Sequence, residues 1–375
     1  MKKYIIRAMA FAALFCLCFG AAQSVLHYRW SGYEDLYTRN IAYSQASSDS
    51  IDVLCFGTSE IYAGYTPIVS YETTGVTGFN FGVTSRSAMT AYYQLLYALK
   101  YQTPSVVICD FSCLFDDKLP SQEEEVYRKV AECMPDKELK EQLTREICEV
   151  DETQSYLYWK FPLLRYHSRW NELSKIDFTP DYQVNGSYPR YQKGALFGTH
   201  TFAGELDAIT PELWDYTDTV SAKFLSLFSI HYYDLMIAAC REKGITMVAV
   251  IPPKISSGAK YAARWETTRE YLDSRGVPCL NYCTYEQVQR MGLNLQAHYY
   301  DDYHLNLTGS AIFTQTLIRD LKEIVNLPDH RGDPSFYDEW EAPPGPIPRK
   351  TSRSVTQVPS GKAPEGTFCI TPFSF

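Results

Sequence analysis

Lysine and arginine are too few in this sequence of 375 residues to balance its acidic side chains. The chain has 35 Lys and Arg against 44 Asp and Glu, a formal net charge of −9. Binding to nucleic-acid phosphates needs clustered basic side chains, so this composition argues against a nucleic-acid partner. Hydrophobic residues make up 45% and charged residues 21%, which is typical of a globular protein with a buried core.

The 11 cysteines lack the spacing of a zinc site. No two of them form a CxxC pair, and Cys279 and Cys283 form a CxxxC pair without histidines in a matching pattern. Cys55 and Cys109 lie in apolar, strand-like runs, where a cysteine packs as a small hydrophobic residue. We therefore expect no metal and no organic cofactor, while the pattern leaves one or two disulfides open.

A second long apolar run is also missing, because only the N-terminus is hydrophobic enough to span a bilayer. Basic residues in the first seven positions precede an almost uninterrupted apolar stretch, residues 8–26. A spanning helix needs about 20 such residues. The pattern indicates an uncleaved anchor or a signal peptide cleaved after Gly20-Ala21-Ala22. We favour an anchor over residues 1–27, with the rest of the chain extracytoplasmic.

Beyond residue 50, short apolar runs alternate with segments of helical periodicity. Runs that are apolar throughout are typical of parallel strands buried on both faces. We therefore expect an α/β fold whose parallel sheet is flanked by helices on both faces, in three layers. The expected strands are 51–56, 77–81, 105–109, 245–251 and 277–282; the expected helices are 87–99, 120–149, 222–243, 259–274 and 305–325.

Three segments interrupt or flank this pattern. Residues 28–49 are polar and Tyr-rich, and we interpret them as a stalk before a domain over 50–327. Residues 150–218 are rich in Tyr, Pro, Gly and Trp and have no steady period, which predicts an irregular cap inserted over the carboxyl ends of the strands. Residues 328–375 are rich in Pro, Gly, Ser and Thr, which favours an extended or disordered tail.

Ser59 follows the first predicted strand directly, in the segment Gly57-Thr58-Ser59-Glu60. Active groups of parallel α/β sheets gather beyond the carboxyl ends of the strands. The next helix would begin near Glu60, so its positive N-terminus would face the Ser59 hydroxyl. This placement suits a nucleophile, and it suits equally a serine that only caps the helix.

Asp301 and His304 lie three residues apart, just before the last predicted helix. At this spacing a carboxylate can turn back to the imidazole and set its tautomer, while the other ring nitrogen takes a proton from a serine. Asp302 is expected to point elsewhere. Together with Ser59, the pattern predicts a Ser-His-Asp triad.

These segments resemble the blocks of the SGNH/GDSL hydrolase superfamily. Gly57-Thr58-Ser59 resembles the first block, residues 79–85 (Phe-Asn-Phe-Gly-Val-Thr-Ser) the second, and residues 301–304 the last. The resemblance implies an SGNH-like, flavodoxin-like fold. It also implies an oxyanion hole made by the backbone N–H groups of Ser59, Gly82 and Ser85.

More narrowly, the chain is similar to the membrane-anchored branch of that superfamily, which includes exopolysaccharide O-acetylation proteins and the D-alanine transfer protein of teichoic acids. The similarity rests on the single anchor, on Gly-Thr-Ser-Glu, on Phe-Asn-Phe-Gly, on Asp-x-x-His-Leu-Asn-x-x-Gly and on residues 161–170. It implies a bacterial, single-pass membrane protein that hydrolyses or transfers acyl esters on envelope glycans. Its partners would be a glycan or acyl carrier and a membrane O-acyltransferase.

Two departures support a different function. The usual glycine of the second block is Ser85, and the usual asparagine of the third block is absent from Cys109-Asp110-Phe111-Ser112. Asn80, which is also a candidate substrate-binding residue, or Ser112 would have to replace that donor. Losing one oxyanion donor costs about 100- to 1000-fold in rate. The alternative is therefore a catalytically weak protein that binds a glycan or carrier.

His167 and Arg169 lie among aromatic residues in the predicted cap. One interpretation is that they contact a glycan or an anionic carrier above Ser59. The other is that they form a packed corner with local hydrogen bonds. The sequence alone does not separate the two.

Overall fold

A computed structural model describes residues 1–27, 33–173, 175–178, 193–196, 198, 200–215, 224–255, 258–336 and 340. The chain falls into two compact units, Met1–Pro343 and Pro344–Phe375. Every element described below belongs to the first unit.

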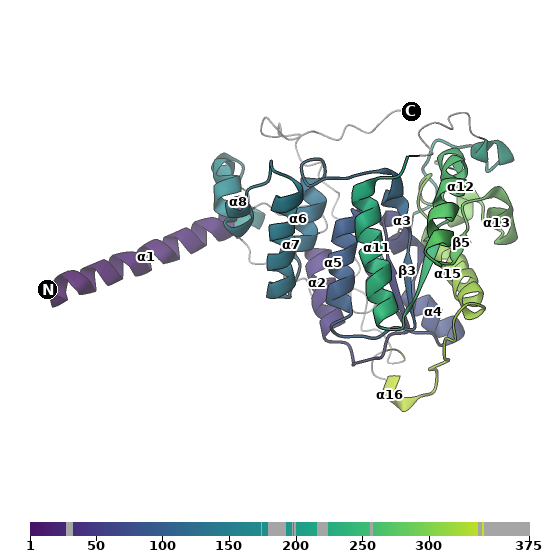
Figure 1. Cartoon of the computed structure of the whole chain (residues 1–375), viewed down its shortest axis with the longest axis horizontal. Coiled ribbons are helices and arrows are strands. Elements are labelled where there is room, and N and C mark those ends of the chain that lie inside the picture. The colour runs from purple at the N-terminus through teal and green to yellow at the C-terminus, as the bar shows by residue number, and fades with distance from the viewer. Residues whose placement is uncertain are drawn as a thin grey trace. The chain divides into compact units, whose positions relative to one another are not determined.

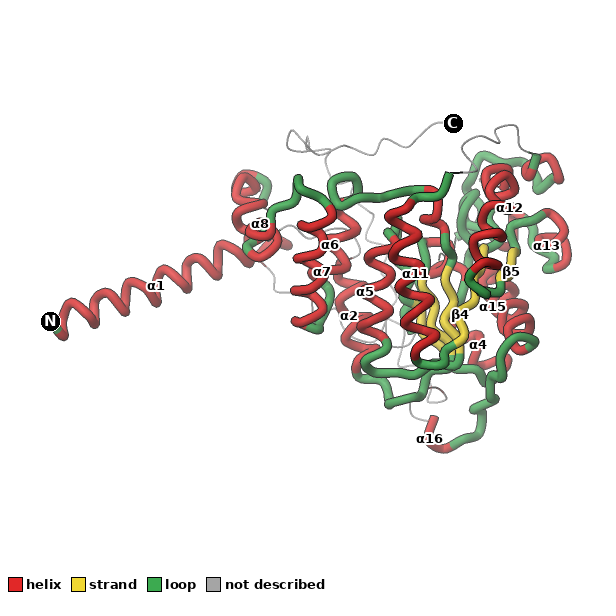
Figure 2. The backbone as a smooth tube through the Cα atoms, in the orientation of Figure 1, coloured by secondary structure: helices red, strands yellow, loops and turns green. Residues whose placement is uncertain are grey.

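The core of the first unit is a five-stranded sheet in which all strands are parallel (Figure 2). The strand order is β2-β1-β3-β4-β5, which is the flavodoxin-like order. The two central strands β1 and β3 are buried along their whole length, as their apolar sequences predict. The strands are β1 (Val53–Phe56), β2 (Gly78–Asn80), β3 (Val106–Cys109), β4 (Thr246–Ile251) and β5 (Cys279–Asn281).

Helices cover both faces of the sheet, which confirms the three-layer α/β prediction (Figure 1). Alternate residues of each strand enter different cores: Leu54 and Val107 lie in one, and Val53 and Val106 in the other. The first core contains side chains of α2 (Tyr33–Ser44), α5 (Ala88–Ala98), α6 (Glu124–Glu132), α7 (Lys137–Val150), α11 (Leu227–Glu242) and α12 (Gly258–Ser274). The second contains side chains of α3 (Ser59–Gly64), α13 (Tyr285–Arg290), α14 (Leu295–His298) and α15 (Leu307–Lys322), and α4 (Pro67–Thr74) packs against α15.

Local signals in the sequence set several helix ends. Ser87 caps α5 in a reciprocal capping box with Thr90. Asn306 caps α15, because its side-chain oxygen accepts the N–H groups of Thr308 and Gly309, both at 3.0 Å. The helix expected over 120–149 is two helices, α6 and α7, and Asp136 caps the second.

The segment interpreted as a stalk is partly core. Tyr43 of α2 is fully buried, and its ring packs edge-on against Phe79 and Phe81 with centroids 4.8 and 4.7 Å apart. Arg39 is also buried, and its Nη1 donates to the Gly82 oxygen at 2.6 Å. The domain therefore begins before residue 50, because α2 supplies one wall of the first core.

The domain also extends beyond the expected boundary at residue 327. The His330 N–H donates to the Gly75 oxygen at 3.0 Å, and its ring lies 3.1 Å from an oxygen of Asp52. The short helix α16 (Pro334–Phe336) follows, and the Phe336 ring stacks on His330. The predicted tail from residue 341 onward lies outside the described residues.

The N-terminus is one helix, α1 (Lys2–Leu26), none of whose residues is buried. Its most apolar window of 18 residues has a mean hydropathy of 2.1. By length and composition this helix can cross a membrane, and a signal sequence has the same properties.

The irregular insertion has two described parts. The first contains α8 (Tyr156–Lys160), α9 (Pro162–Tyr166) and the 3-10 turns η2 (His167–Asn171) and η3 (Lys175–Phe178). The second covers residues 193–196, 198 and 200–215 and includes the turn η4 (Pro211–Trp214). Figure 1 shows α8 beside the inner end of α1.

Candidate active site

Ser59 is the first residue of α3. It lies two residues after Gly57, which directly follows the end of β1. The chain leaves β1 for β2 on one side, while β3 pairs on the other side, so Ser59 lies where the strand order reverses. Only glycine fits at position 57, because an added Cβ would come within 2.8 Å of an Asp110 oxygen. Thr58 occupies the N-cap position of α3, so the Ser59 hydroxyl does not cap this helix.

The Ser59 hydroxyl contacts an imidazole that is in turn held by a carboxylate. The Ser59 Oγ lies 2.7 Å from Nε2 of His304. Both carboxylate oxygens of Asp301 lie 2.9 Å from Nδ1 of the same ring. The structure thus brings together the three residues expected to form a triad, although 245 positions separate serine and histidine.

Asp301 is held as an anion by its own loop. Its Oδ1 accepts the N–H groups of Tyr303 and His304, both at 2.8 Å. Burial favours a raised pKa for Asp301, but the hydrogen bond and charge of His304 and these backbone bonds outweigh it, so the pKa lies below its ordinary value. An ionised Asp301 accepts the proton of Nδ1, which leaves Nε2 as an acceptor toward Ser59.

Tyr300 orients the imidazole from its other side. The two rings are stacked, with centroids 5.2 Å apart and planes 3° from parallel. The Tyr300 N–H also donates to the His304 oxygen at 3.1 Å. Tyr300 belongs to none of the motifs found in the sequence, although its position next to Asp301 could have indicated a role in the site.

A buried ion pair lies directly beside Ser59. Glu60 Oε1 is 2.8 Å from Nζ of Lys254, a residue that follows the carboxyl end of β4 and is only 4% exposed. Burial alone would raise the pKa of Glu60, but the charge and hydrogen bond of Lys254, helped by Thr58, lower it to about 2. Glu60 is therefore an anion that Lys254 neutralises, so no net charge is added beside the nucleophile.

The loop that carries Lys254 also supports the loop of the triad. The Tyr299 hydroxyl donates to the Pro253 oxygen at 2.7 Å, and the Ile255 N–H donates to the Asp302 oxygen at 3.3 Å. Residues 252–255 are therefore joined to α3 through Lys254, and they are joined to the Asp301–His304 loop through the two hydrogen bonds just described. The signal for Lys254 in the sequence was its place after a predicted strand.

The predicted oxyanion donors differ in their availability. The Ser59 N–H lies in the first turn of α3, where N–H groups have no acceptor within the helix. The Gly82 N–H donates to Oδ1 of Asn80 at 2.9 Å, so it is already used. Ser85 has a φ of +52° and lies in a turn. The N–H of Val83 in the same turn donates to the Gly57 oxygen, which holds the turn beside the residues that lead into α3. Ser59 and Ser85 remain the candidate donors.

Asn80 does not contact the site. Its side chain is fully buried, and Nδ2 donates to the oxygens of Ile61 and Tyr65, both at 2.9 Å. With Oδ1 bound to Gly82, the amide is saturated and clamps β2 to α3. The prediction that Asn80 binds substrate or replaces the missing donor is therefore wrong.

A carboxylate that directly follows β3 braces the turn before Ser59. Asp110 Oδ2 accepts the N–H and the hydroxyl of Thr58 at 2.7 and 2.9 Å. Its other oxygen lies 3.1 Å from both the N–H and the hydroxyl of Ser112. Asp110 holds the backbone before Ser59, and the Ser112 hydroxyl is directed to Asp110.

The first part of the insertion turns away from Ser59. Arg169 Nη1 donates to the Leu26 oxygen at the end of α1, and its Nη2 pairs with Asp177 at 2.9 Å. His167 Nδ1 lies 3.0 Å from the Leu164 oxygen. These contacts join the segment to α1 and to its own turns, so His167 and Arg169 form a packed corner, and the expectation that either of them approaches Ser59 is wrong.

The second part of the insertion does border the triad. The Leu196 N–H donates to the Tyr62 oxygen at 3.0 Å, and the Ala203 N–H donates to the Tyr300 oxygen at 3.1 Å. A Cβ added to Gly198 would lie 2.6 Å from the Tyr300 ring. The second part therefore lies beside the loop that carries the triad.

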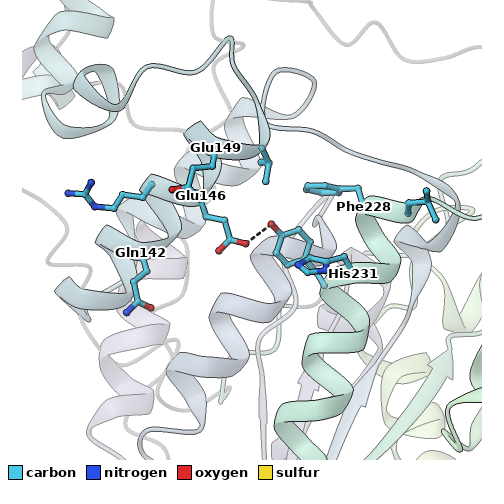
Figure 3. A pocket seen from close by; sticks show the side chains of 9 residues that line it. Gln142, Glu146, Glu149, Phe228 and His231 are labelled. Carbon is cyan, nitrogen blue, oxygen red and sulfur yellow. Dashed lines mark hydrogen bonds between the residues drawn. The ribbon is translucent and has the colours of Figure 1, made fainter.

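A hollow of about 610 Å³ lies elsewhere, between α7 and α11 (Figure 3). Glu146 accepts the Tyr232 hydroxyl across it at 2.7 Å. None of its lining residues belongs to α3 or to the Asp301–His304 loop, so it is separate from the triad. Within the described residues, no group of three or more His, Cys, Asp or Glu side chains can hold a metal, and the ten cysteines there are free thiols.

No family model matches the chain, and no curated protein matches it.

Proposed function

We propose that this protein is a serine esterase or O-acyltransferase of the SGNH type. Ser59 is the nucleophile, His304 the general base and acid, and Asp301 the residue that orients His304. The observation that carries the proposal is the hydrogen-bonded chain from Ser59 Oγ to His304 Nε2, 2.7 Å, and from Nδ1 to Asp301, 2.9 Å.

The chemistry takes two steps. Ser59 Oγ attacks the carbonyl carbon of an acyl ester while His304 takes the hydroxyl proton, and the Ser59 N–H stabilises the resulting oxyanion. His304 then gives its proton to the departing alcohol oxygen, and the C–O bond breaks to leave acyl-Ser59. A sugar hydroxyl or water then loses its proton to His304 and attacks the acyl carbon. The bond between that carbon and Ser59 Oγ breaks, and His304 gives the proton to Oγ, which restores the serine.

The proposed location and substrate rest on sequence resemblance and on α1. We assign the acyl esters of bacterial envelope or exported glycans as the substrate class, because the Gly57-Thr58-Ser59-Glu60 block and residues 161–170 resemble the membrane-anchored branch. The flavodoxin-like strand order agrees with the fold that this resemblance implies, and it does not bear on the substrate. In this proposal α1 anchors an extracytoplasmic domain, and a membrane O-acyltransferase supplies the acyl group.

A serine-directed fluorophosphonate tests the assignment of the nucleophile. The full chain should be labelled at Ser59, and Ser59→Ala should remove the label and lower ester turnover by at least about 10⁴-fold. Ser335→Ala is the matched control, because Ser335 is exposed and bonds only Asp333 among the described residues. Labelling at another serine, or an active Ser59→Ala variant, would contradict the proposal.

A second candidate function is binding without efficient catalysis. It is favoured by the segment Cys109-Asp110-Phe111-Ser112, which lacks the usual third-block asparagine and whose Asp110 carboxylate lies 2.7 Å from the Thr58 nitrogen. A folded wild-type chain that resists the probe and still binds an envelope glycan as tightly as Ser59→Ala would favour this function.

A further inference from the structure

Exposed apolar side chains gather in the first part of the insertion. Large hydrophobic residues there project into solvent, with Trp170 72% and Phe178 64% exposed. Such a concentration on a domain surface marks a contact face rather than scattered exposure. We call this group the aromatic foot; it consists of Leu157, Tyr158, Phe161, Leu164, Trp170 and Phe178.

The aromatic foot lies against the inner end of α1. The Phe161 ring meets the Phe19 ring of α1 edge-on, with centroids 6.1 Å apart. Further along, Arg169 donates to the Leu26 oxygen at 2.9 Å. His27 closes the contact, because its Nε2 lies 2.8 Å from a carboxylate oxygen of Glu132 on α6.

The position of these contacts along α1 sets their depth. From Phe19 to Leu26 a helix rises about 10 Å, at about 1.5 Å per residue. A hydrocarbon core about 30 Å thick needs about 20 apolar residues, so α1 spans it only if nearly all of residues 8–26 are inside. Phe19 then lies below the membrane surface, and Phe161 lies at a similar depth because the two rings touch.

The charges of this region do not compete with burial in lipid. Three cations of the segment each have a carboxylate partner, so their charges are balanced beside the exposed rings and aliphatic groups. The pairs are Lys160 with Glu141 at 2.9 Å, Arg165 with Glu124 at 3.1 Å, and Arg169 with Asp177 at 2.9 Å.

We propose that the aromatic foot is a membrane-interface contact. Its side chains insert into the boundary between headgroups and acyl chains of the bilayer that α1 spans, where aromatic rings are favoured. The occupant of this surface is lipid, because the foot continues the surface of α1, the one helix among the described residues that is long and apolar enough to cross a bilayer. The inference rests on the proposed anchoring by α1 and does not depend on the chemistry at Ser59.

Quenching by brominated lipid tests the depth of the foot. The full chain is placed in phosphatidylcholine vesicles whose acyl chains carry bromine either near the headgroup or near the bilayer centre. Trp170 should be quenched about twofold more by the shallow bromines, because an interfacial group lies about 5–10 Å into the headgroup boundary. Trp170→Phe should remove most of this shallow quenching, and high salt should not change it.

A matched probe on another element provides the control. Leu227 begins α11 and is 81% exposed, so Leu227→Trp in the Trp170→Phe background should add fluorescence that bromine does not quench. Quenching unchanged by Trp170→Phe, or equal quenching of Leu227→Trp, would overturn the foot.

Flotation of the same vesicles separates the two hypotheses. A chain that floats but shows no shallow quenching overturns the foot alone. A chain that does not float overturns the anchor and the foot together, while fluorophosphonate labelling of Ser59 still reports on the proposed chemistry.

Discussion

The two parts of the irregular insertion were expected to form one cap, and they have different neighbours. The first part, residues 156–178, packs against α1, α6 and α7. The second part, from residue 193, hydrogen-bonds to Tyr62 and Tyr300 beside the triad. Both parts looked like one cap in the sequence because both lack a helical or strand period.

The difference shows that a sequence without a regular period identifies an irregular segment but does not indicate which part of the protein that segment contacts. Burial and hydrogen-bond partners decide this, and they are supplied by distant elements. Arg169 bonds Leu26, which is 143 positions away, and Gly198 forms a bridge with Asn306. The first part therefore packs against the inner end of α1, and the second part packs against the loop of the triad.

The largest expected effect tests the triad that the second part borders. Asp301→Asn should lower ester turnover about 10⁴-fold, because an amide cannot accept the Nδ1 proton as Asp301 does and so disturbs the tautomer of His304. Asp302→Asn is the matched control, because Asp302 faces Gly204 instead of the imidazole. Steady-state turnover of both variants decides the matter, and a larger loss in Asp302→Asn would shift the triad by one residue.

Removing Lys254 should produce the next largest effect, on stability. Lys254→Met leaves buried Glu60 without its cation, which should cost about 3–5 kcal/mol of unfolding free energy at neutral pH. Lys243→Met, on an exposed lysine after α11, is the control and should cost little. Urea unfolding measures both, and equal stability of the two variants would refute the role of the ion pair.

The Glu60–Lys254 pair predicts that the unfolding free energies of the wild type and of Lys254→Met change in opposite directions as the pH falls. In the wild type the pKa of Glu60 is lowered from 4.5 to about 2, so its contribution is complete above pH 4.5 and is lost as pH falls toward 2. In Lys254→Met, burial should instead raise this pKa above 4.5, so acidification from neutral pH should recover stability. Unfolding curves at several pH values compare the two slopes.

Arg169→Ala should separate the first part of the insertion from catalysis. The change removes the guanidinium that lies 2.9 Å from buried Asp177, which should cost about 1.5–3 kcal/mol of unfolding free energy, the range for a hydrogen bond to a charged group. Turnover of a small soluble ester by the folded variant should stay normal, because this corner faces α1. A stable Arg169→Ala variant that has lost turnover would show instead that Arg169 acts in the active site.

Gly198→Ala should give the smallest effect, at the second part. The new methyl group would lie 2.6 Å from the Tyr300 ring that stacks on His304, so a shifted imidazole should lower turnover about tenfold. Gly20→Ala on α1 is the control, because a Cβ there meets no atom within 4 Å. Equal turnover of the two variants would show that the second part does not position His304.

The sequence by itself determined the sheet and the three residues of the proposed triad. Strands that are apolar throughout can be satisfied only between two layers, so the parallel three-layer fold was predictable from β1 and β3. Ser59 was found because it directly follows a strand, and Asp301 and His304 because their three-residue spacing is local. In each case the signal lies within a few residues of the chain.

Only the tertiary structure decided what Asn80, Arg169 and α2 do. Asn80 looked like a donor for substrate, but the oxygens of Ile61 and Tyr65 saturate its amide. The polar sequence of α2 hid the buried side of Tyr43, which meets Phe79 and Phe81. A polar group acts on a substrate only if the fold leaves it without internal partners, and those partners come from segments far away in the sequence.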